Sequence, residues 1–235
     1  MRGGKGRPDK MAGCLSTGLA MPTSTPSPAG PSTEAERDAR VVQDTVRWLE
    51  RAVIGLNLCP FAKGVHGKGQ IHYVVCGASS PAGVLHSLER ELLALVAAPP
   101  AERDTTLLML SGGLDDFLDF NDFLDESDAL LESLGLAGVL QIASFHPQFR
   151  FAGTGADDVS NCTNRAPWPT LHLLREDSLD RAVEAFPEAE AIFGRNVEVL
   201  EALGAQGWEA LGVGAGGAER PADAPGGAPA GGAGA

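Results

Sequence analysis

The stretch TLLML at residues 106–110 decides the class of fold, because it is apolar almost throughout and carries no charge. A continuous apolar strand is typical of a sheet that is covered on both faces. A second candidate strand, 71–76, lies upstream, and between the two strands Pro81 begins a helical stretch. The buried face of that helix is expected to consist of Leu85, Leu88, Leu92, Leu95 and Val96.

An amphipathic helix precedes the first strand. Thr33 and Glu36 form a capping-box pattern, which marks the start of a helix. Apolar residues then recur at three- and four-residue steps as far as Val53, and Gly55 marks the expected end. The loop that follows, up to Gly69, contains Cys59.

Helices and strands keep alternating downstream of the central strand. We expect a helix at 115–134, strands at 139–145 and 170–174, and two short closing helices, the second ending at Gly204. Alternating helices and strands favour parallel strands with right-handed crossovers. The sequence therefore predicts one α/β domain over 33–212, with a small, mostly parallel sheet of about four strands covered by helices.

The two ends of the chain have a different composition. Residues 1–32 are rich in Gly, Pro, Ser and Thr, and residues 213–235 consist mostly of Gly, Ala and Pro. Such segments bury too little apolar surface to offset the entropy of ordering. We expect both to be disordered tails of the single domain.

Charge and cysteine content narrow the possible partners and the compartment. The chain has 235 residues and a formal net charge of −13, and such a surface repels nucleic-acid phosphates and anionic membranes. It has no apolar run long enough for a membrane span. Its four cysteines form no C-x-x-C pair, which favours reduced thiols in the cytoplasm. We therefore expect no nucleic-acid or membrane partner.

The segment 146–169 is the main candidate for a site. It has no helix or strand period, and a structureless stretch of this length is often functional. It begins where a strand ends, at the edge where ligands of parallel sheets gather, together with Cys76 and Ser111-Gly112-Gly113. Its side chains suit proton transfer, anion binding and orientation, and the candidates are His146, Arg150, Asn161, Asn164 and Arg165.

Cys59 and His172 are two further candidates outside this segment. Cys59 is a possible nucleophile, although its apolar setting before Pro60 favours a buried structural cysteine. His172 alternates with Leu171 and Leu173 on a strand, which is more typical of a buried, hydrogen-bonded histidine than of a catalyst. It is kept as a candidate substrate-binding residue.

The helix at 115–132 is strongly acidic and has no basic residue. Its acids are spaced as on a helix rather than as in a calcium-binding loop, so no metal is expected there. A solvated helix face is the favoured interpretation. A docking surface for another protein is the alternative.

Four motifs resemble an uncharacterised bacterial family, the domain of unknown function DUF1415. They are VIGLNLCPFA at 53–62, DFNDFL at 119–124, ASFHPQF at 143–149 and NRAPWPTLHLLR at 164–175. The resemblance covers roughly residues 40–210 and implies no activity. It places Cys59, His146, Asn164, Arg165 and His172 at motif positions.

The leading functional hypothesis is a small-molecule enzyme that acts on an anionic metabolite. His146 would be the general acid or base, Cys59 a possible nucleophile, and Arg150 and Arg165 the anion-binding groups. Asn161 and Asn164 would orient the substrate. One alternative is a non-catalytic protein-binding module that uses the acidic helix. The other is a metal-dependent enzyme using His146 and Cys59, although no ligand spacing supports a metal site. The sequence names no cofactor.

Overall fold

A four-stranded sheet lies at the centre of the compact unit that begins at Thr33. The structure, a computed structural model, describes residues 33–185 and 191–215. The strands are β1 (Ile71–Cys76), β2 (Thr105–Leu110), β3 (Leu140–Phe145) and β4 (Thr170–Arg175), in the order β1-β2-β4-β3. The tail predicted at 1–32 and residues 216–235 of the other tail lie outside the described residues.

The prediction of a mostly parallel sheet is wrong. Only one neighbouring pair, β1 and β2, is parallel, whereas β4 lies between β2 and β3 and is antiparallel to both. The reason lies in the connection between β3 and β4, which contains no long helix that returns the chain to the opposite edge of the sheet. Residues 146–169 instead stay at the edge where β3 ends, so β4 begins there and runs back.

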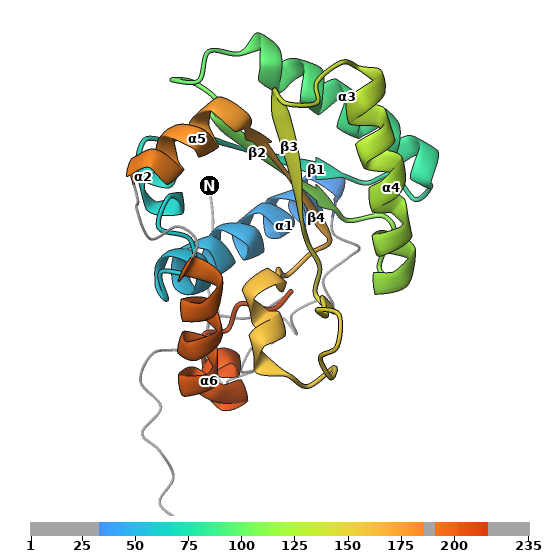
Figure 1. The fold of residues 1–235 in the computed structure, drawn as a ribbon. Coiled ribbons are helices and arrows are strands. Elements are labelled where there is room, and N and C mark those ends of the chain that lie inside the picture. The colour runs from blue at the N-terminus through green and yellow to red at the C-terminus, as the bar shows by residue number, and fades with distance from the viewer. Residues whose placement is uncertain (1–32, 186–190, 216–235) are drawn as a thin grey trace, which may run out of the picture. The chain divides into compact units, whose positions relative to one another are not determined.

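One face of the sheet is covered by α3 (Pro81–Ala97) and α4 (Phe117–Ser133), drawn in green and yellow-green in Figure 1. The largest apolar core lies in this layer. Leu88, Leu92 and Leu95 of α3 are fully buried, as predicted, and they pack with Phe120 of α4 and with the sheet. Burying each such side chain contributes about 1.5–3 kcal/mol. Leu85 is only half-buried, and the predicted burial of Val96 is wrong, because its side chain is exposed near the end of the helix.

The opposite face is covered by the N-terminal helices and by α5 (Glu176–Ala185). The capping box of Thr33 and Glu36 is confirmed at the start of α1 (Glu34–Trp48), which continues as a π-helix, η1 (Leu49–Ile54). A short helix, α2 (Ala62–Gly67), follows within the predicted loop. The layer is anchored to the sheet where Trp48 packs edge-on against Phe145, with 5.2 Å between ring centroids.

The last helix, α6 (Ile192–Ala210), packs against a 3₁₀-helix, η2 (Val159–Asn164), inside the segment predicted to have no helix. It continues past the expected stop at Gly204. That glycine has φ +69° and ψ 172°, so the helix is interrupted there rather than ended. Its first half is fixed to the N-terminal layer by the Asn196 side-chain amide, which donates to the Leu58 carbonyl at 2.8 Å.

Candidate functional site

The residues predicted to gather at one edge of the sheet do so. The Ser111 amide donates to the Cys76 carbonyl at 2.9 Å, and the His146 ring reaches the Leu114 carbonyl at 3.2 Å. Gly112 is required by close backbone approach, because a β-carbon there would lie 2.2 Å from the Gly77 carbonyl oxygen. The turn after β2 is therefore packed against the turn after β1.

His146 is fully buried behind this turn, between the rings of Phe117 and Phe120. Its Nδ1 accepts from the Gln148 amide at 3.0 Å, which leaves Nε2–H to donate to the Leu114 carbonyl. Burial lowers the pKa of His146, although the Leu114 carbonyl and the nearby carboxylates oppose the shift. Both ring nitrogens thus have partners, and the ring secures Leu114, which has φ +60°.

The two candidate asparagines hold the segment 146–169 together. The Asn161 side-chain oxygen accepts from the Phe151 amide at 2.9 Å and from the Thr154 hydroxyl at 2.8 Å, while its NH₂ donates to the Gly155 carbonyl. Asn161 is fully buried. The Asn164 NH₂ donates to the Ser144 carbonyl at 3.3 Å, and its backbone carbonyl accepts from the His146 amide.

The two candidate arginines line a common hollow of about 400 Å³, here called the arginine hollow. Arg165 also braces its own segment, because Nε donates to the Phe149 carbonyl at 3.1 Å and a terminal nitrogen to the Ala156 carbonyl at 2.6 Å. Arg150 is exposed. The remaining lining comes from the start of α4 and from the same segment, and consists of Asp116, Phe117, Leu118, Pro147, Gln148 and Ala156.

Cys59 and His172 lie elsewhere, in a partly enclosed cavity of about 290 Å³ on the other face of the sheet, here called the apolar chamber. Its floor is the sheet, through Ile71, Thr105, Leu107, Ala143, Phe145, His172 and Leu174. The N-terminal layer supplies Trp48, Leu49, Val53, Cys59, Phe61, Ala62 and Val65. The rest of the wall consists of Asp104 before β2, Arg175 at the end of β4, and three residues of α5, which are Ser178, Leu179 and Ala182.

A hydrogen-bonded pair, Thr105 and His172, interrupts this apolar lining. The Thr105 hydroxyl donates its single proton to the Leu173 carbonyl at 2.6 Å. Its contact with His172 Nε2 at 2.7 Å therefore needs the histidine as donor. In that tautomer Nδ1 is unprotonated, and none of the described residues hydrogen-bonds to it. Burial lowers the pKa of His172 to about 4, so the ring is neutral at pH 7.

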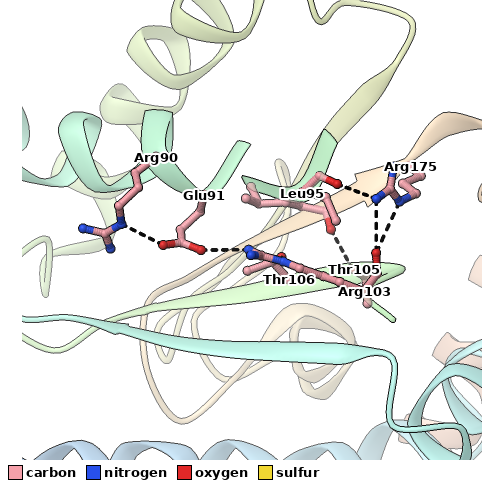
Figure 2. A network of polar contacts seen from close by, with 8 residues as sticks. Arg90, Glu91, Leu95, Arg103, Thr105, Thr106 and Arg175 are labelled. Atoms are coloured by element: carbon pink, nitrogen blue, oxygen red, sulfur yellow. Dashed lines mark hydrogen bonds and ion pairs between the residues drawn. The ribbon is translucent and has the colours of Figure 1, made fainter. Parts of the chain in front are cut away.

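Arg175, which also borders the chamber, belongs to a polar network that fixes the neighbouring helix (Figure 2). Its guanidinium donates to the carbonyls of Leu95, Ala98 and Arg103, at and beyond the end of α3. A cation at the C-terminal end of a helix also stabilises the helix dipole. The chamber wall is thereby tied to α3 on the far face of the sheet.

In the same network Glu91 is buried, with its side chain 8% exposed. Its carboxylate accepts from Arg103 at 2.7 Å and from Arg90 at 2.9 Å. Burial alone would raise the pKa of Glu91, but the hydrogen bonds and charges of Arg103 and Arg90 outweigh it and lower the pKa. Arg103 also donates to the Thr106 hydroxyl at 2.9 Å, which joins this pair to β2.

The acidic residues of the predicted helix at 115–132 all lie on the exposed surface of α4 and the turn before it. They are Asp115, Asp116, Asp119, Asp122, Asp125, Glu126, Asp128 and Glu132. Asp116 caps the helix by accepting from the amides of Leu118 and Asp119.

Two absences concern residues 33–185 and 191–215, the part of the chain that the structure describes. In these ranges no group of three or more His, Cys, Asp or Glu side chains is placed to hold a metal ion. No helix there is long and apolar enough to cross a membrane. Cys59, Cys76 and Cys162 are free thiols.

The predicted site residues thus fall into separate groups, with His146, Asn161 and Asn164 inside the loop, Arg150 and Arg165 at the arginine hollow, and Cys59 and His172 at the apolar chamber. The sequence left open whether Cys59 and His146 lie close together. Cys59 lines the apolar chamber, whereas the His146 ring packs against Phe117 and Phe120 of α4. Sequence reasoning missed Thr105 as the partner of His172. The available signal was a threonine at the start of an otherwise apolar strand, but pairing it with His172 requires the antiparallel register of β2 and β4.

The structure is that of a small mixed α/β protein. Its apolar chamber lies between the sheet and the N-terminal helices, and its arginine hollow lies beside the start of α4. The chain belongs to the family described as "Protein of unknown function (DUF1415)", which it matches over residues 40–210. This match confirms the family predicted from the motifs, and the description assigns no activity. Neither a curated protein nor a solved structure matches the chain.

Proposed function

We propose that this protein binds a small molecule with an apolar body and one hydrogen-bond donor, and that the apolar chamber is its binding site. The observation that carries the proposal is the neutral His172. Its Nδ1 is an acceptor without a hydrogen-bond partner among the described residues, and its ring lines a mostly apolar cavity. Such cavities, apolar with a few fixed polar groups, are the usual form of small-molecule sites.

The size of the chamber limits the ligand. The volume is about 290 Å³. It holds on the order of ten non-hydrogen atoms, if each takes roughly the 30 Å³ that one water molecule occupies in the liquid. A single aromatic ring with a short side chain is of this size. The walls support such a ligand, because Trp48, Phe61 and Phe145 offer aromatic contact surfaces on the helical and sheet sides.

The Thr105–His172 pair supports recognition rather than proton abstraction. A hydroxyl on the ligand can donate to Nδ1, while Thr105 keeps the ring in the required tautomer. An imidazole with a pKa of about 4 is a weak base at neutral pH. The pair is therefore suited to selecting a ligand hydroxyl and poorly suited to activating the Cys59 thiol.

The test is calorimetric titration with two probes of one scaffold, 4-propylphenol and propylbenzene, which differ by the hydroxyl. We expect the phenol to bind about tenfold more tightly, the effect of one hydrogen bond of about 1.4 kcal/mol. Ala143→Leu, which fills the chamber, abolishes binding of both probes. His172→Phe removes only the preference for the phenol, and the exposed His86→Phe serves as the matched control. Failure of both probes to bind the wild-type protein contradicts the proposal.

The arginine hollow supports a second candidate function, the binding of a small anion as the sequence hypothesis expects. The supporting observation is that Arg150 and Arg165 line one hollow of about 400 Å³ beside the start of α4. Asp116 also lines it and opposes an anion. Inorganic phosphate titrated against wild-type protein and Arg150→Gln tests it, because Arg150 braces none of the described carbonyls, whereas Arg165 does. Equal phosphate affinity for the two proteins contradicts it.

A further inference from the structure

A second hollow adjoins the apolar chamber at the edge of the sheet where β1 and β2 begin. It has a volume of about 410 Å³ and is here called the mouth. The two cavities share Phe61 and Val65 of the α2 region, Ala182 and Ser178 of α5, and Asp104 before β2. A molecule in the chamber therefore has the mouth as its neighbouring space, and the lining that the two cavities share combines three apolar side chains with one hydroxyl and one carboxylate.

The mouth has two cationic side chains that the chamber lacks. Lys68 and Arg181 line the mouth and not the chamber. Both side chains are exposed, and within the described part of the chain neither forms an ion pair. The mouth thus has two cations without an ion-pair partner among the described residues, on a chain whose net charge is −13.

One acid, Asp104, also lines the mouth, and its charge is partly engaged. Arg181 donates to the Ser178 hydroxyl oxygen at 3.0 Å, and that hydroxyl donates to the Asp104 carboxylate at 2.6 Å. With two cations and one carboxylate the lining carries a formal charge of +1 (2 − 1). The mouth thus favours an anionic group, whereas most of the surface does not.

We infer that the ligand of the chamber is an amphipathic acid, with a hydroxyl at its inner end, an apolar body, and a carboxylate that Lys68 and Arg181 hold at the mouth. This inference rests on the proposed function, because it assumes that the apolar body occupies the chamber. It adds the charge at the outer end. The chamber supplies apolar contact and the His172 acceptor, and the mouth supplies the cations that a carboxylate pairs with.

The experiment compares 4-propylphenol with 3-(4-hydroxyphenyl)propanoate, in which a carboxylate replaces the terminal methyl group. Calorimetric affinities are measured for the full chain at low and high salt. We expect the acid to bind about tenfold more tightly than the phenol at low salt, and its advantage to shrink at high salt because the mouth is exposed to solvent. The double variant Lys68→Gln/Arg181→Gln removes the advantage and leaves binding of the phenol unchanged. Lys63→Gln, an exposed lysine of α2 that lines neither cavity, is the matched control.

The outcomes separate the two claims. If the phenol binds and the acid binds no more tightly, or its advantage survives the double variant, the inference is overturned and the proposed function stands. If neither probe binds, or if Ala143→Leu leaves both affinities unchanged, the chamber is not the site and both claims fall. Loss of the acid's advantage in Lys63→Gln as well as in the double variant indicates long-range charge rather than the mouth, and this also overturns the inference.

Discussion

We expect mild acidification to destabilise this protein through the titration of His172. This occurs at a higher pH than the protonation of the protein's carboxylates. Burial holds the pKa of the folded-state ring at about 4, against 6.5 for the exposed ring of the unfolded chain. Because the folded-state value is the lower one, the unfolded chain binds more protons as the pH falls. The contribution of His172 to stability is therefore fully present above pH 6.5 and is lost as the pH falls toward 4.

The size of the effect follows from the two pKa values. A difference of 2.5 (6.5 − 4) corresponds to about 3 kcal/mol when the ring is protonated only in the unfolded chain. Most of this change falls at mildly acidic pH, with about 2 kcal/mol lost between pH 7 and pH 5. The pKa of His146 is also lowered by its burial and adds a change of the same sign.

Urea denaturation of wild-type protein and His172→Phe at a series of pH values between 7 and 5 measures this effect. We expect the wild-type free energy of unfolding to fall with pH and the slope in the variant to be shallower by about 2 kcal/mol over the interval. His86→Phe, at an exposed position of α3, is expected to keep the wild-type slope. An unchanged slope in His172→Phe refutes the neutral state of the half-buried ring and, with it, the tautomer that gives the chamber its acceptor.

Three further substitutions test a buried ion pair, a close contact between two turns, and the hydrogen bonds of the segment 146–169. Glu91→Gln weakens the buried pair with Arg103 and is expected to lower the free energy of unfolding by about 2 kcal/mol, measured by chemical denaturation, while the exposed Glu102→Gln has little effect. Gly112→Ala places a β-carbon 2.2 Å from the Gly77 carbonyl oxygen and lowers the melting temperature, whereas Gly64→Ala, with nothing within 4 Å, does not; equal melting temperatures would show that the two turns are not in close contact. Asn161→Ala removes three hydrogen bonds from a buried side chain, so we expect a loss of about 3 kcal/mol and faster proteolysis within residues 146–169; an unchanged cleavage rate argues against its bracing role.

Local signals in the sequence predicted the elements well, because they depend on a few neighbouring residues. The Thr33–Glu36 capping box starts α1, and the apolar run at residues 106–110 is a fully buried strand. The predicted direction of β4 is wrong, because the alternation of helices and strands does not imply a crossover between every two strands. The segment 146–169 lacks a crossover helix. This feature of the sequence indicates that β4 runs back antiparallel to β3.

The candidate site was harder to predict, because it depends on which side chains share a face of the sheet. Polar residues in a long loop suggested chemistry, yet their hydrogen-bonding groups are occupied by the protein itself. Asn161 bonds within the loop, and the His146 ring bonds the Gln148 amide and the Leu114 carbonyl. Cys59 and His172 were identified as candidates, but sequence spacing does not reveal that they border one cavity. That proximity arises from the packing of η1 and α2 over the sheet.

The most direct test of the account is a crystal structure of the protein with 4-propylphenol. We expect the phenol ring to lie between the sheet and the N-terminal helices, with its hydroxyl within hydrogen-bonding distance of His172 Nδ1. Two results would contradict the assignment of the chamber as the binding site. One is density for the phenol at the arginine hollow while the chamber is empty, and the other is a chamber filled by protein side chains.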